Sequence, residues 1–286
     1  MTAIQSFRRW RVAMSGLAAA VVVMFLVGTP MGRTAFAEFL AQFRSQRFAP
    51  VAIDSQQARG PFFQLERLGT IQGTPSRGNT EVVASVAIAS QRLGFQVKQP
   101  DPATLPANVS KTPTVRVGAA TEARFTFDRE KAREYFRSIG RPDVTLPDRF
   151  HGVSIVAQIP AGVLLEYRGQ DGTAVLVGQS RELVVGTDGA VTLEEIRDFL
   201  LNVPGLPPEM VRQLRAINDW RNTLPIPFPA DRVNWQPATI GGVPALMLAE
   251  NGGIGSGAIW QRDGFVHGVA GTVRPAGVQR IGDGLR

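Results

Sequence analysis

The chain has 286 residues, enough for one large or two modest domains, and its 44% hydrophobic and 19% charged residues argue against global disorder. The net charge of +7 is spread along the chain among interleaved acids, which argues against nucleic-acid binding and leaves attraction to a membrane surface as the better use of the excess. The absence of cysteine excludes disulfides, thiol nucleophiles and thiolate metal ligands.

Near the N-terminus, residues 12–32 (VAMSGLAAAVVVMFLVGTPMG) carry no charge and are flanked by arginine at both ends. A helix of this length spans about 31 Å, close to the hydrocarbon thickness of about 30 Å. Arg8, Arg9 and Arg11 form a tight basic cluster, which favours a cytoplasmic N-terminus. We therefore expect a cytoplasmic tail over residues 1–11 and a single transmembrane helix over 12–32. The chain beyond it is expected to lie outside the cytoplasm.

A cleaved signal peptide is the alternative for the same segment. Ala35-Phe36-Ala37 resembles a cleavage site, and cleavage near Ala37 would release the protein from the membrane. About ten residues separate Val27 from this site, and one of them is Arg33, which is long for the polar part of a signal. The anchor is therefore the favoured interpretation.

Residues 33–48 predict a juxtamembrane helix. Phe36, Phe39, Leu40 and Phe43 recur at helical spacing and form one apolar stripe. The helix either packs on the domain that follows or lies on the membrane with its arginines at the lipid headgroups.

Residues 49–286 are expected to form an extracytoplasmic α+β domain, a mainly antiparallel sheet with several helices packed on it, with a possible subdomain boundary near 141–152. Strands are predicted at 49–54, 65–73, 115–117 and 123–127 and directly after Gly94. Two helices are predicted, one over 80–94 with Thr80 as N-cap and Gly94 as its stop, and one from the N-cap Asp128 to Ile139, stopped by Gly140.

The second half of the chain alternates short β runs with turn residues. Four runs between 154 and 186 predict an antiparallel meander, and the runs at 242–250, 256–264 and 265–273 predict further strands. Thr192 and Glu195 match a capping box that opens a helix to Val203. Further elements are a helix over 209–220 with Met210, Leu214 and Ile217 on one face and Trp220 as a further candidate for it, an extended proline-spaced segment at 224–232, and a terminal helix at 276–285.

The glycine cluster in ENGGIGSGAIWQRDG, residues 250–264, does not match a phosphate-binding loop. Such a loop lies between a strand and a helix, whereas β-rich residues follow here, and neither Gly-Lys-Ser/Thr nor G-x-G-x-x-G spacing is present. The glycines predict a hairpin loop, with Asp263-Gly264 as the next turn.

Residues with catalytic or metal-binding chemistry are few and scattered. His267 lies in an apolar strand and His151 in a loop, and two histidines without cysteine do not fill a structural zinc site. Asp188 and Glu195 match the second half of an EF-hand loop, but Val184 and Gly186 stand where oxygen ligands are needed, so a turn followed by a helix cap explains them better.

No catalytic, metal or cofactor-binding residue is predicted, and the ligand-binding residues are unknown at this point. A G-x-S-x-G elbow is absent from the sequence, which argues against a serine hydrolase of the α/β type. Trp10 suits a membrane interface, and Trp220, Trp235 and Trp260 are expected to fill the core in preference to lining an apolar groove.

The segments TEVVASVAIASQRLGFQVKQPDPATLP, FLAQFRSQRF, LLNVPGLPPEMVRQL with TLPIP, and SGAIWQRDGFVHGVAG resemble the extracytoplasmic domain of bacterial anti-sigma-factor-like membrane proteins. That domain has no assigned biochemical function, and a fainter similarity links it to the curved-sheet lipoprotein-sorting fold of envelope-stress regulators. The chain lacks the cytoplasmic zinc domain of anti-sigma factors, and a tail of about 11 residues is too short to sequester a sigma factor alone.

Together these features predict a non-catalytic, membrane-anchored binding or sensing module of a bacterial envelope regulatory system. Its partners would be the lipid bilayer and a protein in the envelope or membrane, with no nucleic acid. The alternatives are a carrier of a lipid or other apolar ligand in a curved-sheet cavity, and an envelope hydrolase.

Overall fold

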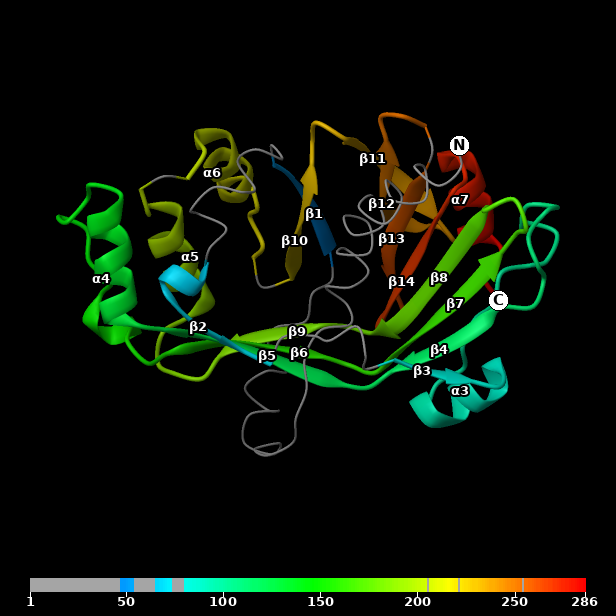
Figure 1. Cartoon of the computed structure of the whole chain (residues 1–286), viewed down its shortest axis with the longest axis horizontal. Coiled ribbons are helices and arrows are strands. Elements are labelled where there is room, and N and C mark those ends of the chain that lie inside the picture. Colours follow the sequence, from blue (N-terminus) through cyan, green and yellow to red (C-terminus); the bar gives the residue numbers. More distant parts are fainter. Residues whose placement is uncertain (1–46, 54–64, 74–79, 205, 221, 254) are drawn as a thin grey trace, which may run out of the picture.

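The computed structural model describes residues 47–53, 65–73, 80–204, 206–220, 222–253 and 255–286 (Figure 1). Within these ranges the chain is α+β, with mostly antiparallel sheets and five α-helices. The helices are α3 (Val86–Leu93), α4 (Arg129–Ser138), α5 (Leu193–Leu201), α6 (Pro208–Arg215) and α7 (Pro275–Asp283). None of them combines the length and the apolar character needed to cross a bilayer. The transmembrane helix predicted at 12–32 lies outside the described residues.

The described strands form three sheets. The largest has the order β11 (Val233–Ile240), β12 (Val243–Glu250), β13 (Ser256–Arg262), β14 (Phe265–Gly271), β8 (Ala174–Arg181), β7 (Gly162–Arg168), β4 (Thr114–Gly118) and β3 (Thr80–Val83). A second sheet has the order β2 (Gly69–Gln72), β5 (Thr121–Phe127), β6 (Ser154–Ile159) and β9 (Val184–Thr187). The third is a parallel ribbon of β1 (Arg47–Ile53) and β10 (Thr223–Pro229).

The two antiparallel sheets are continuous through three strands that bend from one sheet into the other. β4 passes into β5, β6 into β7, and β8 into β9, each after two intervening residues. Pro160 lies at one bend, where a residue without a backbone N–H breaks the ladder, and Gly118 pairs with Gly162 beside it. The result is a curved platform that runs the length of the molecule (Figure 1).

The outer face of the large sheet holds the main apolar core. Val163, Leu165 and Trp260 on this face pack with Ala89 of α3 and Ile281 of α7. Burial of this face explains why α7 forms, because its apolar residues Val278 and Ile281 are fully buried against the sheet.

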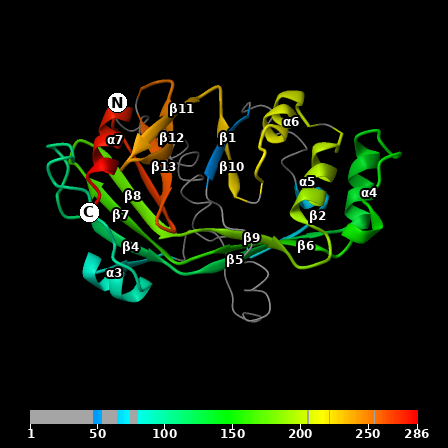
Figure 2. The ribbon, with the colours of Figure 1, turned by 180° about the vertical axis from the view of Figure 1, so that it is seen from behind.

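At the opposite end of the platform, α4 and α5 cover the second sheet. Phe127 of β5 and Phe136 of α4 are buried there, and Phe150 lies between Phe127 and Phe199, with ring centroids 5.8 and 5.3 Å away. Figure 2 shows these helices together with α6 at one end, and α3 and α7 at the other.

The parallel ribbon lies between these two ends (Figures 1 and 2). Ile226 and Phe228 of β10 pack on Leu246, Leu248 and Ile259 of the inner face of the large sheet. This packing covers the inner face of the large sheet from β12 to β14.

Prolines limit the ribbon to two described strands. Pro225, Pro227 and Pro229 take every second position of β10, and Ala230 donates its N–H to Ile53. Alternate residues of a strand direct their N–H groups to opposite edges, so the edge of β10 that faces away from β1 lacks a donor at these three positions. No further strand can pair there with a complete ladder.

Several sequence predictions are confirmed. The Asp128 cap of α4, the capping box of Thr192 and Glu195, and the strands at 115–117 and 123–127 are all present. The glycine cluster is the loop between β12 and β13, where Gly253 has a φ of 68°, and Asp263-Gly264 is the turn between β13 and β14. The strand at 49–54, the segment at 224–232 and the terminal helix correspond to β1, β10 and α7.

The helix predicted over 80–94 was wrong in its first turn. Residues 80–83 are the edge strand β3, paired with β4, and the N-cap of α3 is Ser85, whose Oγ accepts the N–H of Ile88 at 3.2 Å. The β-branched pair Val82-Val83 favours the strand. Gly94 ends the helix as predicted, with a φ of 67°.

The strand predicted after Gly94 was also wrong. Side chains take the place of a ladder at Val97, which donates its N–H to Ser90 Oγ, and at Lys98, whose N–H and carbonyl oxygen both bond to Gln179. Only an isolated backbone bridge follows, between Pro100 and Leu285. The strand predicted at 65–73 begins instead with a 3₁₀ turn, Leu65–Arg67, before β2.

The simple meander predicted between 154 and 186 was wrong in its pairing. Sequential neighbours β6 and β7 lie in different sheets, and β6 pairs with β5 and β9. The bend at Pro160 removes the hairpin that the spacing predicted. β11 was not predicted at all, because its exposed polar residues and Pro237 mask the strand pattern.

Two predicted helices end differently. Arg47 and Phe48, the last residues of the predicted juxtamembrane helix, belong to β1, and the rest of that helix lies outside the described residues. α6 stops at Arg215 instead of Trp220, because the turn-forming residues Asn218 and Asp219 follow, and the Asp219 carboxylate accepts the N–H of Asn222. Ile217 and Trp220 therefore leave the predicted apolar face.

The close packing of α7 gives a testable prediction. A Cβ on Gly282 would lie 2.7 Å from Ile240 Cγ2 and 3.1 Å from the Trp260 ring, whereas a Cβ on Gly277 would meet Val273 at 3.4 Å. Gly282→Ala should lower the free energy of unfolding by about 1–3 kcal/mol through overpacking. Gly277→Ala, the control on the same helix, should leave it unchanged or raise it by up to about 1 kcal/mol. Urea unfolding of the two variants decides, and equal stabilities would contradict the packing.

Candidate functional site

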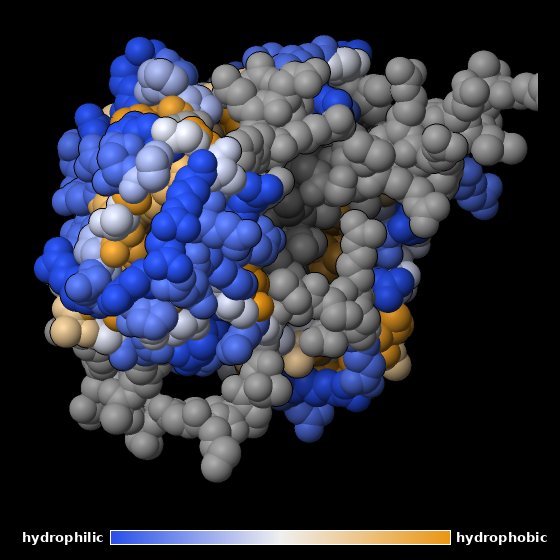
Figure 3. Space-filling view, turned by 60° about the vertical axis from the view of Figure 1, so that its left-hand side comes forward, coloured by the Kyte–Doolittle hydropathy of each residue, from blue (hydrophilic) through white to orange (hydrophobic). Residues whose placement is uncertain are grey.

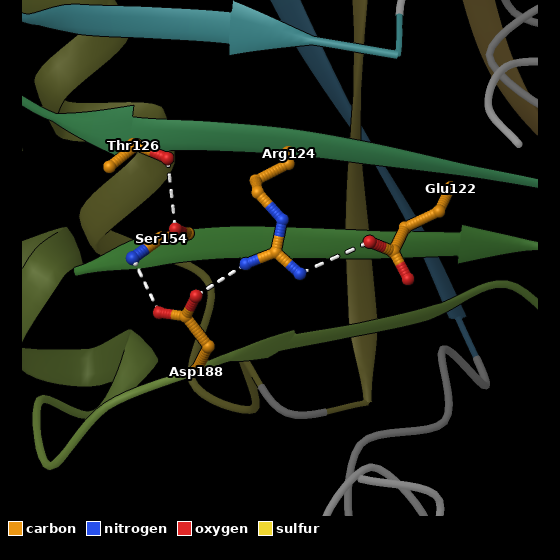
Figure 4. A network of polar contacts seen from close by, with 5 residues as sticks. All are labelled: Glu122, Arg124, Thr126, Ser154 and Asp188. Carbon is orange, nitrogen blue, oxygen red and sulfur yellow. Dashed lines mark hydrogen bonds and ion pairs between the residues drawn. The ribbon is translucent and has the colours of Figure 1, made fainter. Parts of the chain in front are cut away.

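A polar network lies on the second sheet (Figure 4). The guanidinium of Arg124 on β5 pairs with Asp188, at the end of β9, and with Glu122 at 3.1 Å. Asp188 also accepts the N–H of Ser154 at 2.7 Å, and the Ser154 and Thr126 hydroxyls lie 2.9 Å apart. The network thus connects three neighbouring strands on one face.

These contacts give the network a structural role. The two carboxylates share one guanidinium, and Asp188 satisfies a backbone donor where the pairing of β6 with β9 ends. The other residue of the EF-hand-like match, Glu195, accepts the N–H of Thr192 in the capping box, which lowers its pKa. Glu195 therefore serves the helix cap that the sequence predicted. Asp188 bonds to side chain and backbone groups of the neighbouring strands β5 and β6.

The two histidines lie in different settings. His151 is exposed after a 3₁₀ turn, Asp148–Phe150, and its Nδ1 accepts the N–H of Arg129 at 3.2 Å. His267 is 6% exposed on β14 and stacks on Trp260 with ring centroids 5.6 Å apart. Burial lowers the pKa of His267 from 6.5 to about 4, and the charges of Lys98 and Arg262 contribute to this shift. His267 is therefore neutral at pH 7 and belongs to the packed core.

A hollow of about 390 Å³ opens beside the C-terminal ends of α5 and α6. It is lined by Arg197, Asp198 and Leu201 of α5 and by Asn202 directly after it, and by Arg215, Ile217 and Trp220 from the end of α6 and the segment after it. Figure 3 views this end of the molecule, where hydrophilic side chains predominate and smaller hydrophobic areas lie between them.

Arg215 is held at this hollow by Asn202. The amide nitrogen of Asn202 donates to the carbonyl oxygen of Asp198 at 2.6 Å, and its amide oxygen accepts from Arg215 at 3.2 Å. These two bonds fix which way the amide of Asn202 points. Among the described residues, Arg215 has no carboxylate within ion-pair distance, so most of its five N–H donors stay available.

The second arginine of the hollow is already neutralised. Arg197 pairs with Asp198 at 2.6 Å, and its guanidinium lies over the Trp220 ring, 5.8 Å from the centroid. The indole N–H of Trp220 is buried and has no acceptor among the described residues. Two arginines and one carboxylate give this lining a net charge of +1.

The tryptophans divide between core and surface. Trp260 is 3% exposed and fills the core, as expected. For Trp235 the expectation was wrong, because it lies on the edge strand β11 and is 46% exposed. Trp220 is half-buried and lines the hollow. It had already been named from the sequence.

Arg197, Arg215 and Asn202 were not singled out by sequence reasoning. No spacing rule connects residues 197–202 with 215–220, because the relative placement of α5 and α6 decides which side chains meet. The short spacing from Asp198 to Asn202, one helical turn, is the only part of the arrangement that a local pattern contains.

Comparison of the chain with protein-family models, with curated proteins and with solved structures finds no match.

The polar network predicts a stability effect. Asp188→Ala leaves the N–H of Ser154, a residue only 3% exposed, without its acceptor. We expect the free energy of unfolding to fall by about 1–3 kcal/mol. Asp143→Ala, which removes an exposed ion pair with Arg141, should change little. Chemical denaturation measures both, and a neutral Asp188→Ala would show that the network does not stabilise the sheet.

Burial of His267 predicts a pH dependence. Its pKa in the folded chain is lower than in the unfolded chain, so the unfolded state binds more protons between pH 6.5 and about 4. The resulting stability is present above pH 6.5 and is lost as the pH falls through this window. Between pH 7 and pH 5 the free energy of unfolding of the wild type should fall by about 2 kcal/mol more than that of His267→Phe.

Denaturation of the wild type, His267→Phe and the exposed control His151→Gln at both pH values measures this difference. Parallel losses in all three proteins would contradict the assigned burial.

Proposed function

We propose that the chain is a non-catalytic binding and sensing module of a bacterial envelope. Residues 12–32 anchor it in the cytoplasmic membrane, the folded part lies outside the cytoplasm, and β1 transmits the state of the folded part to the anchor. A protein in the envelope or membrane would receive the signal.

The position of β1 is the observation that carries this proposal. β1 is the first described element after the predicted anchor, and it contacts two separate parts of the fold. Val51 and Ile53 pack with Met210 of α6, whereas Phe48 and Ala52 contribute to the cluster on the inner face of the large sheet. A change at α6 therefore reaches the strand that leads to the N-terminal segment.

A single hydrogen bond strengthens the link between β1 and α6. Ala52 donates its N–H to Gln213 Oε1 at 2.8 Å, on the side of β1 that faces away from β10. Pro50, two residues earlier on the same edge of β1, has no N–H. Ala52 is therefore the backbone donor that this edge offers to α6. The polar lining of the hollow next to α6 favours recognition of a polar ligand over transport of a purely apolar one.

The membrane orientation is tested by cysteine labelling, since the chain has no cysteine of its own. Glu134→Cys, on the exposed face of α4, should react with a membrane-impermeant maleimide in intact spheroplasts. Gln5→Cys, in the predicted tail, should react only after lysis. The reverse pattern, or full release of the protein into the medium, would contradict the anchored orientation.

The coupling is tested by removing the bond between β1 and α6 from each side. Ala52→Pro deletes the donor without touching the ladder to β10, and Gln213→Ala deletes the acceptor. In the full-length chain, both should raise amide exchange in α6 about 5-fold or more, because losing the bond costs about 1 kcal/mol or more. α4, at the far end of the second sheet, is the internal control. Unchanged exchange in α6 would show that β1 does not hold this helix.

A further inference from the structure

We propose that the hollow between α5 and the end of α6 is a binding site for a small organic carboxylate with a compact apolar body. Arg215 binds the carboxylate, Asn202 positions Arg215, and Leu201, Ile217 and Trp220 contact the apolar part. This inference names the ligand class of the proposed sensing module, and the site itself can be tested without the membrane orientation.

The net charge of the residues that line the hollow favours a carboxylate as the ligand's head group. Of the charged groups that line the hollow, Arg197 is neutralised by Asp198, which leaves the single positive charge of Arg215. A carboxylate carries one negative charge and matches the planar fork of one guanidinium through two parallel hydrogen bonds. A phosphate monoester carries close to two negative charges at pH 7 and would leave one of them uncompensated.

The positioning of Arg215 distinguishes it from an ordinary surface arginine. Arg212, on the same helix, is ion-paired with Glu209 one turn away, as is typical of a solvated helix face. Arg215 instead meets an amide whose orientation is fixed by the backbone of α5. Holding a long side chain in place before the ligand arrives reduces the entropy lost on binding.

The apolar residues that line the hollow favour an apolar body in the ligand. Leu201 and Ile217 supply apolar contact, and Trp220 supplies an aromatic ring that Arg197 holds by stacking. A volume of about 390 Å³ lies within the range of small-molecule sites. The ligand is therefore compact, with one acidic end and one flat or branched apolar end.

The site also suggests what the module senses. Arg215 ends α6, and the same helix holds β1 through Gln213 and Met210. A carboxylate bound to Arg215 would act on the helix that contacts β1, the strand that follows the predicted anchor.

Fluorine NMR of the full-length chain in dodecyl maltoside, labelled with 5-fluorotryptophan, tests the site. The Trp220 resonance is assigned by its loss in Trp220→Phe. We expect 2-naphthoate to shift this resonance saturably, with the uncharged 2-naphthamide at least about 10-fold weaker and 2-naphthyl phosphate weaker than the carboxylate.

Three variants separate the roles of the residues. Arg215→Gln should weaken the binding of 2-naphthoate about 10-fold or more. Asn202→Ala should weaken this binding less, because the arginine remains but is no longer held in place. The matched control Arg212→Gln should bind within about 2-fold of the wild type. The Trp235 and Trp260 resonances report whether each variant is folded.

The proposal is overturned if the Trp220 resonance shows no saturable shift, or if folded Arg215→Gln binds as the wild type does. Tighter binding of 2-naphthyl phosphate would overturn the assignment to carboxylates. If 2-naphthoate binds but the orientation test fails, the binding site is supported and the anchored sensing function is contradicted. If the orientation and coupling tests succeed but 2-naphthoate does not bind, the proposed function is supported and this ligand class is contradicted.

Discussion

The contact of β1 with both α6 and the large sheet is the constraint on which the rest of the arrangement depends. One face of this strand completes the cluster with Met210, and the other faces the inner surface of β12 and β13. β1 therefore joins α6 to the inner face of the large sheet. The parallel pairing with β10, whose outer edge is closed by prolines, fixes β1 at this position.

Local patterns in the sequence determine much of the fold. Asp128 and the pair Thr192 and Glu195 define helix starts by hydrogen bonds within one turn, so they are readable from spacing alone. The Asp263-Gly264 turn is equally local, because both residues take positive φ values. Pairing is not local. Pro160 signals a break in a strand, but only the assembled sheets decide that β6 and β7 separate.

The candidate site shows the same division. Trp220 stands out in the sequence as one of four tryptophans, yet the pattern places it on a helix face that ends five residues earlier. Arg215 and Asn202 are thirteen residues apart and meet because α5 and α6 converge. The functional meaning of an arginine depends on its partner, and no local rule separates Arg215, held by an amide, from Arg212, paired with Glu209.

The most direct test of the account measures β1 while the hollow is filled. Amide exchange of Ala52 and its neighbours in β1 would be followed in the full-length chain, with and without saturating 2-naphthoate. The account predicts slower exchange in both α6 and β1, because they share the bond from Ala52 to Gln213 and the packing around Met210. Protection of α5 and α6 with unchanged exchange in β1 would contradict the claim that this strand connects the site to the N-terminal segment.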